Sequence, residues 1–136
     1  MSIEAKKQAL IEDFALFDDW EGKYEYIIDL GKNLPLISPN LKTDDKLVKG
    51  CQSRVWIDAS YSNGLVFFTA DSDAIITKGI IALLISVFNG ESPQTIALSN
   101  TDFIDQIGLK EHLSPTRSNG LVSMINLMKS FALKHC

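Results

Sequence analysis

The chain has 136 residues, of which 46% are hydrophobic and 22% charged, and a formal net charge of −4. This is the composition of an ordinary globular protein, so we expect residues 1–136 to form a single domain with a core of its own. The acidic balance argues against nucleic-acid binding, which requires a basic face.

Two helices are predicted before an irregular loop. Residues 2–17 carry apolar side chains at helical spacing, and a second helix is expected from Asp18 to residue 30. Asp18 and Glu21 form a D-x-x-E pattern that is typical of a helix start. Gly31 and the Leu-Pro pair at 34–35 are expected to end this helix, and a Pro-containing loop follows to about residue 45.

The middle of the chain changes to a period of two. In residues 53–58, Val55 and Ile57 point to one face, and the residues between them point to the other. The Ser-Asn-Gly sequence at 62–64 is a hairpin-turn signal, and residues 65–70 are expected to return as the second strand. Residues 46–48 are a candidate third strand, which would place Cys51 in a tight loop between strands.

The remaining chain is predicted to be helical. Residues 73–88 are apolar on every side, which indicates a buried helix, and the apolar run at 80–88 is too short to span a bilayer. Ser92 and Thr101 are expected to cap two short helices, and Pro115 stands near the start of a last helix. The fold class is therefore α+β, a small antiparallel sheet of two or three strands covered by helices.

Cys51 is the candidate nucleophile of the chain. It follows Gly50 in a polar loop just before an apolar strand, and Lys49 and Arg54 supply nearby positive charge that would favour a thiolate. The alternative from the residues alone is a packed structural cysteine, because free cysteines are among the most buried residue types.

Four stretches in the same order resemble the SufE family. Residues 50–57, GCQSRVWI, resemble the signature around the reactive cysteine of these proteins, which are sulfur-acceptor partners of cysteine desulfurases. Residues 20–28 resemble the W-x-x-K-Y-x-Y-I-I helix of the family, and residues 71–79 resemble its D-S-D-A helix start. Residues 112–121 resemble its H-L-S/T-P-S/T-R-S-x-G-L segment.

The resemblance implies a function and a set of partners. Such a protein would dock onto a pyridoxal-phosphate cysteine desulfurase, receive sulfur as a persulfide on Cys51, and pass it to an iron–sulfur scaffold. It would be a sulfur-transfer accessory protein rather than a stand-alone enzyme, with no cofactor of its own. The resemblance also implies a fold shared with the iron–sulfur scaffold proteins.

Four further residues are implied to stabilise the persulfide or bind the partner: Arg117, Asp73, Gly50 and Gln52. For Arg117 the residues alone favour a solvated side chain. For Asp73, capping of the helix and interaction with its dipole are sufficient reasons for an acidic residue. Arg54 departs from the family pattern, which often has glutamine there, and adds charge beside the thiol.

Several alternatives remain open from the sequence. One is a free-standing thiol transferase or hydrolase, although a hydrolase needs a base and neither His112 nor His135 lies in a hydrolase signature. His112 is expected to hydrogen-bond within its loop. Others are the paralogous acceptor of a second desulfurase system and a non-catalytic interaction module.

Metal binding, a disulfide and export are not expected. The cysteines and histidines have no C-x-x-C or H-x-x-x-H spacing, and no glycine-rich phosphate loop is present. The two cysteines are far apart, and Cys136, at the end of the chain, is assigned no role. Without a disulfide framework or a visible secretory signal, a cytoplasmic location is expected, with no membrane partner.

Overall fold

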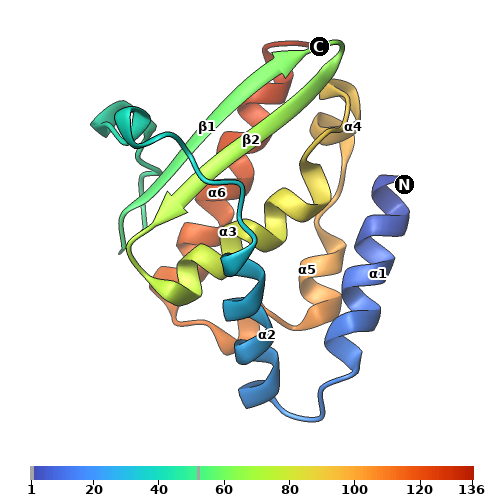
Figure 1. The fold of residues 1–136 in the computed structure, drawn as a ribbon. Helices are drawn as coiled ribbons and strands as arrows, with labels where there is room; N and C mark the ends of the chain where they lie inside the picture. Colours follow the sequence, from blue (N-terminus) through green and yellow to red (C-terminus); the bar gives the residue numbers. More distant parts are fainter. Residues whose placement is uncertain (1, 52) are drawn as a thin grey trace.

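The computed structural model describes residues 2–51 and 53–136, and it confirms the α+β class (Figure 1). Its helices and strands are α1 (Ile3–Ala15), α2 (Trp20–Lys32), β1 (Val55–Ser62), β2 (Leu65–Ser72), α3 (Ile75–Phe88), α4 (Pro93–Leu98), α5 (Asp102–Ile107) and α6 (Pro115–Leu133). Short 3-10 turns lie at Pro39–Leu41, Asp44–Lys46 and Lys110–His112.

The sheet of the described chain is a two-stranded antiparallel hairpin. β1 and β2 pair along their whole length, and the turn residues Asn63 and Gly64 both have positive φ, 54° and 79°. Asn-Gly favours this turn because both residues tolerate the left-handed region. The predicted third strand is reduced to one bridge between Leu47 and Trp56. One face of the hairpin is buried, as the alternation predicted, through Val55, Ile57, Val66, Phe68 and Ala70.

The start of α2 lies one residue later than the sequence suggested. Asp19, rather than Asp18, is the N-cap residue, and its side chain accepts a hydrogen bond of 2.9 Å from the Gly22 N–H. The expected end at Gly31 is also wrong, because α2 continues to Lys32 and Gly31 is buried inside it.

The position of Gly31 is explained by the close crossing of α2 and α3. A Cβ atom on Gly31 would lie 3.1 Å from the backbone nitrogen of Gly79, and one on Gly79 would lie only 2.1 Å from the carbonyl oxygen of Ile27. Both glycines therefore act as contact points between helices, where the absence of a side chain lets two backbones approach.

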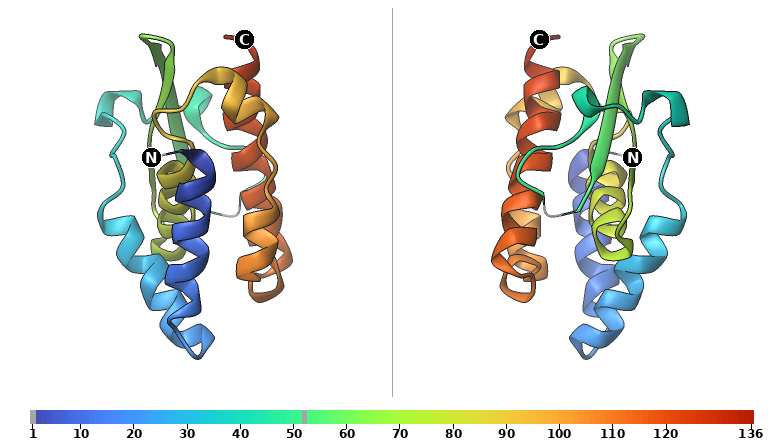
Figure 2. Two further views of the ribbon diagram at one scale, coloured as in Figure 1. Left: turned by 90° about the vertical axis from the view of Figure 1, so that its right-hand side faces the viewer. Right: turned by 90° about the vertical axis from the view of Figure 1, so that its left-hand side faces the viewer.

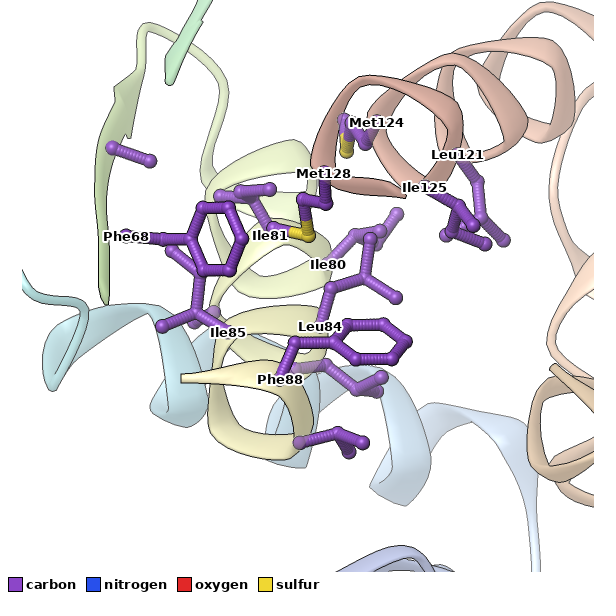
Figure 3. Packing of buried hydrophobic residues seen from close by; sticks show 14 of the residues in the cluster. Phe68, Ile80, Ile81, Leu84, Ile85, Phe88, Leu121, Met124, Ile125 and Met128 are labelled. Atoms are coloured by element: carbon purple, nitrogen blue, oxygen red, sulfur yellow. The ribbon is translucent and has the colours of Figure 1, made fainter. Parts of the chain in front are cut away.

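The core is built around α3, which is buried on almost every side, as its apolar sequence predicted. Figure 3 shows Phe68 of β2 on one side of α3 and side chains of α6 on another. The α6 residues in this cluster are Leu121, Met124, Ile125 and Met128. α3 is thus held between the hairpin and α6, and this arrangement fixes where the N-terminal ends of α3 and α6 lie.

The last turn of the chain packs against the hairpin. His135 stacks on Tyr61 of β1, with ring centroids 4.6 Å apart and an interplanar angle of 18°. The C-terminus accordingly lies beside the hairpin turn in Figure 1, and both views of Figure 2 show α6 on one side of the hairpin. Within the described residues, no helix is long and apolar enough to cross a membrane.

Candidate active site around Cys51

A small cavity of about 290 Å³ connects Cys51 with α3 and α6. Cys51 and Ser53 form one wall and lie in the loop before β1. The other walls are the first half of α3, through Thr77 and Ile80, and the first half of α6. The α6 side chains and backbone that line the cavity belong to Thr116, Arg117, Gly120 and Met124. Cys51 is half-buried, so its sulfur is covered but close to the surface.

Two glycines allow the Cys51 loop to approach α6. Gly50 has a φ of +85°, a backbone conformation that side chains disfavour, and a Cβ there would lie 3.0 Å from Ser123 Oγ. A Cβ on Gly120 would lie 3.0 Å from Cys51 Sγ. Gly50 thus allows the loop to turn, because its backbone has a positive φ. The missing side chain of Gly120 leaves the space in which the Cys51 sulfur lies.

Asp73 fixes the other end of the loop. Its Oδ1 accepts a hydrogen bond of 3.1 Å from the Arg54 backbone N–H, and its own N–H donates to the Arg54 carbonyl oxygen at 3.2 Å. The expected helix-capping role is wrong, because the N-cap residue of α3 is Ala74 and its N–H donates to Ser72 Oγ. Asp73 is nevertheless exposed, so its charge is also presented at the surface beside the Cys51 loop.

Asp71, near the end of β2, has a structural role. It pairs with Lys42 and, at 3.4 Å, with Lys78. Burial alone would raise the pKa of Asp71, but hydrogen bonds from Lys42 and from the Ser72 N–H, together with the Lys78 charge, outweigh it and lower the pKa. Lys42 also lies over the ring of Trp56, 5.2 Å from its centroid. Asp71 therefore ties the loop before β1 to the hairpin and to α3.

Arg117 lies at the rim of the cavity. It is the third residue of α6, which begins at Pro115, and its N–H donates to the capping Ser114 Oγ at 3.3 Å. Its side chain is exposed, and it forms no ion pair with any residue in 2–51 or 53–136. The structure thus brings Cys51, Arg117, Asp73 and Gly50 to one region of the surface, whereas Gln52 lies outside the described residues.

Burial raises the pKa of the Cys51 thiol above its ordinary value. This result differs from the expectation that Lys49 and Arg54 would favour the thiolate. Both residues are exposed, where water screens their charge, while the sulfur itself is half removed from water. In this arrangement Cys51 is therefore a neutral thiol that is partly protected from reagents in the solvent.

Alkylation measures this protection directly. At neutral pH we expect Cys51 to react with iodoacetamide more slowly in the native protein than in the unfolded chain, because the thiolate is the reactive form. The rate should rise with pH through a midpoint higher than that of the unfolded thiol. Because the folded-state pKa is the higher one, the contribution of Cys51 to stability is complete below the unfolded pKa and is lost as pH rises through the folded pKa.

The protein for this measurement carries Cys136→Ser, so that Cys51 is the only thiol. Asp73→Ala, which removes the acceptor for the Arg54 N–H, should speed the native reaction, whereas Asp73→Asn keeps an acceptor and should not. Native and unfolded rates that coincide at every pH would show that the cavity does not protect the sulfur.

His112 has the structural role that the sequence predicted. Its Nδ1 lies 3.0 Å from the Gly108 carbonyl oxygen, and its ring stacks on Trp20 with centroids 3.9 Å apart. Tyr24 donates a hydrogen bond to the His112 carbonyl oxygen. His112 does not line the Cys51 cavity.

Among the described residues, no group of three or more histidine, cysteine or acidic side chains is placed to hold a metal ion. Cys136 is exposed after the end of α6, and its thiol lies 3.4 Å from the Ala132 carbonyl oxygen.

Sequence reasoning missed six of the described residues that line the cavity: Ser53, Thr77, Ile80, Thr116, Gly120 and Met124. Thr77 carried a signal that was available, since it is one of the few polar residues, with Lys78 and Ser86, in a helix that is otherwise apolar. A buried polar side chain in such a helix requires an explanation.

The comparison with protein families decides the classification. Residues 8–132 match the SufE model, described as an Fe-S metabolism associated domain. The chain belongs to the SufE family. A SufE-like protein of Rhizobium meliloti (strain 1021), uncharacterized by its name, is 41% identical over 129 residues, which cover 90% of this chain and 91% of the relative. A second, of Rhizobium etli, is 38% identical over 133 residues and covers 94% of this chain and 90% of the relative.

The SufE-family fold is also found among solved structures. The solution structure of a hypothetical protein from Thermus thermophilus superposes with a TM-score of 0.79. The match covers 95% of this chain and 94% of the other, at 22% sequence identity. The arrangement of hairpin and helices is therefore one that a distantly similar sequence also adopts.

Proposed function

We propose that this SufE-family protein is a sulfur acceptor: Cys51 takes the outer sulfur from the persulfide of a cysteine desulfurase and passes it to iron–sulfur cluster assembly. The observation that carries this proposal is the placement of Cys51. Its half-buried thiol lies at a small cavity, on a loop that begins with a glycine of positive φ and is held after the cysteine by Asp73.

The chemistry requires one thiol and no further catalytic group on this chain. The Cys51 thiolate attacks the outer sulfur of the donor persulfide, a new S–S bond forms on Cys51, and the S–S bond of the donor breaks. The electron pair of the broken bond leaves on the donor cysteine as a thiolate. The proton that Cys51 gives up on becoming a thiolate is taken up by the departing donor thiolate, and any proton on the transferred sulfur stays with it. The step therefore needs neither an oxidant nor a reductant. Pyridoxal phosphate belongs to the desulfurase.

The surroundings of Cys51 favour transfer over hydrolysis. None of the described residues that line the cavity is a histidine, an aspartate or a glutamate, so a general base for a thiol hydrolase is not at hand. The neutral resting thiol is suited to a carrier that should not react with unrelated electrophiles.

Arg117 and Asp73 are proposed to form the docking edge for the desulfurase. Both are exposed and carry opposite charges. Arg117 lies in the first turn of α6, and Asp73 lies between β2 and α3, where it is hydrogen-bonded to the Arg54 backbone after the Cys51 loop. Arg117 would also stabilise negative charge on a sulfur at the rim of the cavity.

The docking edge is tested by titrating a desulfurase with each variant at two ionic strengths. Arg117→Ala and Asp73→Asn should each require more protein for half-maximal stimulation, and the difference from wild type should shrink at high salt because exposed charges are screened. Lys134→Ala, which removes an exposed charge near the C-terminus, serves as the control. Wild-type titrations for both variants, with unchanged melting, would remove these two residues from the proposed interface.

Sulfur transfer itself is tested by mass. After incubation with a purified cysteine desulfurase and cysteine, the intact protein should gain the mass of one sulfur atom, released by a reductant. Peptide mapping should place it on Cys51. Sulfur found on Cys136, or no added sulfur while the desulfurase turns over, would contradict the proposed function.

A further inference from the structure

Thr77 is a polar residue in an apolar environment. It is the third residue of α3, only 6% of its surface is exposed, and most of its neighbours along the helix are buried apolar side chains. Together with Ile80, one turn later, it forms the α3 wall of the Cys51 cavity.

The hydroxyl of Thr77 has no hydrogen-bond partner among residues 2–51 and 53–136, although a buried hydroxyl normally finds one. Within the same residues, no side-chain oxygen is both sealed from solvent and unbonded, so this hydroxyl keeps contact with open space. The space that Thr77 lines is the cavity. Its hydrogen-bonding capacity is therefore available to whatever occupies the cavity beside Cys51.

The sulfur-loaded form of the proposed function needs such a donor. A persulfide on Cys51 adds an outer sulfur that is negatively charged when ionised, and a buried anion is costly unless it is hydrogen-bonded. Among the other described lining residues, Ile80, Gly120 and Met124 are buried, Ser53 is half-buried, and Thr116 and Arg117 are exposed, so Thr77 carries the buried hydroxyl of this lining. The N-cap residue of α3 makes no side-chain hydrogen bond to the first turn, so the positive end of that helix also favours an anion at this place.

We propose that the Thr77 hydroxyl donates a hydrogen bond to the outer sulfur of a Cys51 persulfide and stabilises its anionic form inside the cavity. This inference rests on the proposed function. Thr77 would then be a sulfur-stabilising residue, distinct from the packing residues of α3. It would act from the α3 wall together with Arg117 of α6. The bond forms only after loading, which explains why the hydroxyl has no partner among the described residues of the unloaded protein.

The test uses Thr77→Val, which removes the hydroxyl and keeps the shape of the side chain. The protein carries Cys136→Ser and is loaded on Cys51 with inorganic polysulfide, and one added sulfur is verified by mass. Alkylation of the outer sulfur by iodoacetamide is then followed against pH, because its rate reports the ionised fraction. A change in the accessibility of the outer sulfur alters the maximal rate of alkylation. A change in the stability of its anion instead moves the pH at which the rate is half-maximal.

We expect the midpoint to rise in Thr77→Val, which corresponds to a loss of about tenfold to a hundredfold in the ionisation constant for one hydrogen bond to a charged acceptor. Thr77→Ser, which keeps the hydroxyl, should retain the wild-type midpoint. Ser86→Ala removes an exposed hydroxyl on the same helix, bonded to the Leu83 carbonyl oxygen, and should also leave the midpoint unchanged.

The outcomes separate this inference from the proposed function. A wild-type midpoint in Thr77→Val would overturn the role of Thr77 and leave sulfur transfer by Cys51 intact. Equal shifts in Thr77→Val and Thr77→Ser would also overturn it, because the effect would then follow side-chain shape rather than the hydroxyl. Wild-type protein that takes up no sulfur from polysulfide or from the desulfurase would contradict the proposed function itself.

Discussion

Cys51→Ser is expected to abolish the stimulation of a cysteine desulfurase while leaving the fold intact. Serine cannot carry a sulfane sulfur, so the variant should bind the desulfurase without relieving it of its persulfide. The loss of stability should be below about 1 kcal/mol, because the side chain is half-buried and serine is no larger. Desulfurase turnover, followed by sulfide release with a reductant present, and thermal melting of each variant measure the two effects.

The matched control is Cys136→Ser, which removes the other thiol from an exposed position after α6. This control should stimulate the desulfurase as the wild-type protein does. A Cys51→Ser protein that still stimulates would show that the desulfurase responds to docking alone. A large loss of stability would instead identify Cys51 as a core residue.

Gly79→Ala is expected to destabilise the protein by about 3 kcal/mol or more, because no rotamer change can make room for the added methyl group. Its Cβ would lie 2.1 Å from the Ile27 carbonyl oxygen, so α2 and α3 would have to move apart. The cost exceeds the gain in helix propensity from replacing glycine by alanine, about 1 kcal/mol. Urea unfolding, followed by circular dichroism, measures the difference.

Gly31→Ala provides a graded comparison, since its Cβ would be 3.1 Å from the nearest atom, and it should cost less than Gly79→Ala. Ser86→Ala, at an exposed position of α3, should change stability by no more than about 0.5 kcal/mol. An unfolding midpoint for Gly79→Ala equal to that of wild type would show that the two helices do not cross as closely as the structure places them.

The elements that were predicted well are those whose signals are local. The burial alternation of Val55 and Ile57, the Asn-Gly turn and the apolar character of α3 each follow from a period or a turn preference of a few residues. The error at the end of α2 has a different origin. Glycine usually ends a helix, but Gly31 is retained inside α2 because α3 crosses there, a contact with the distant Gly79 that the sequence does not display.

The predictions for the candidate site also divide into local features, which the sequence displays, and tertiary contacts, which it does not. Cys51 and the glycine before it could be identified from the sequence, since a cysteine in a polar loop and the family signature are both local features. The capping role given to Asp73 was wrong because its true partner, the Arg54 backbone, is brought to it by hairpin pairing. The state of the thiol was also misjudged, because desolvation depends on what covers the sulfur, and not on neighbours in the sequence.

The sequence by itself therefore determined the fold class, the family and the cysteine proposed to carry the chemistry. Each of these follows from short-range patterns of hydrophobicity, from turn residues or from a sequence motif. Only the tertiary structure decided that Thr77, Gly120 and Arg117 surround Cys51, and that the thiol rests neutral in a cavity. The physical reason is that cavities, solvent exposure and pKa shifts arise where elements distant in the chain pack together.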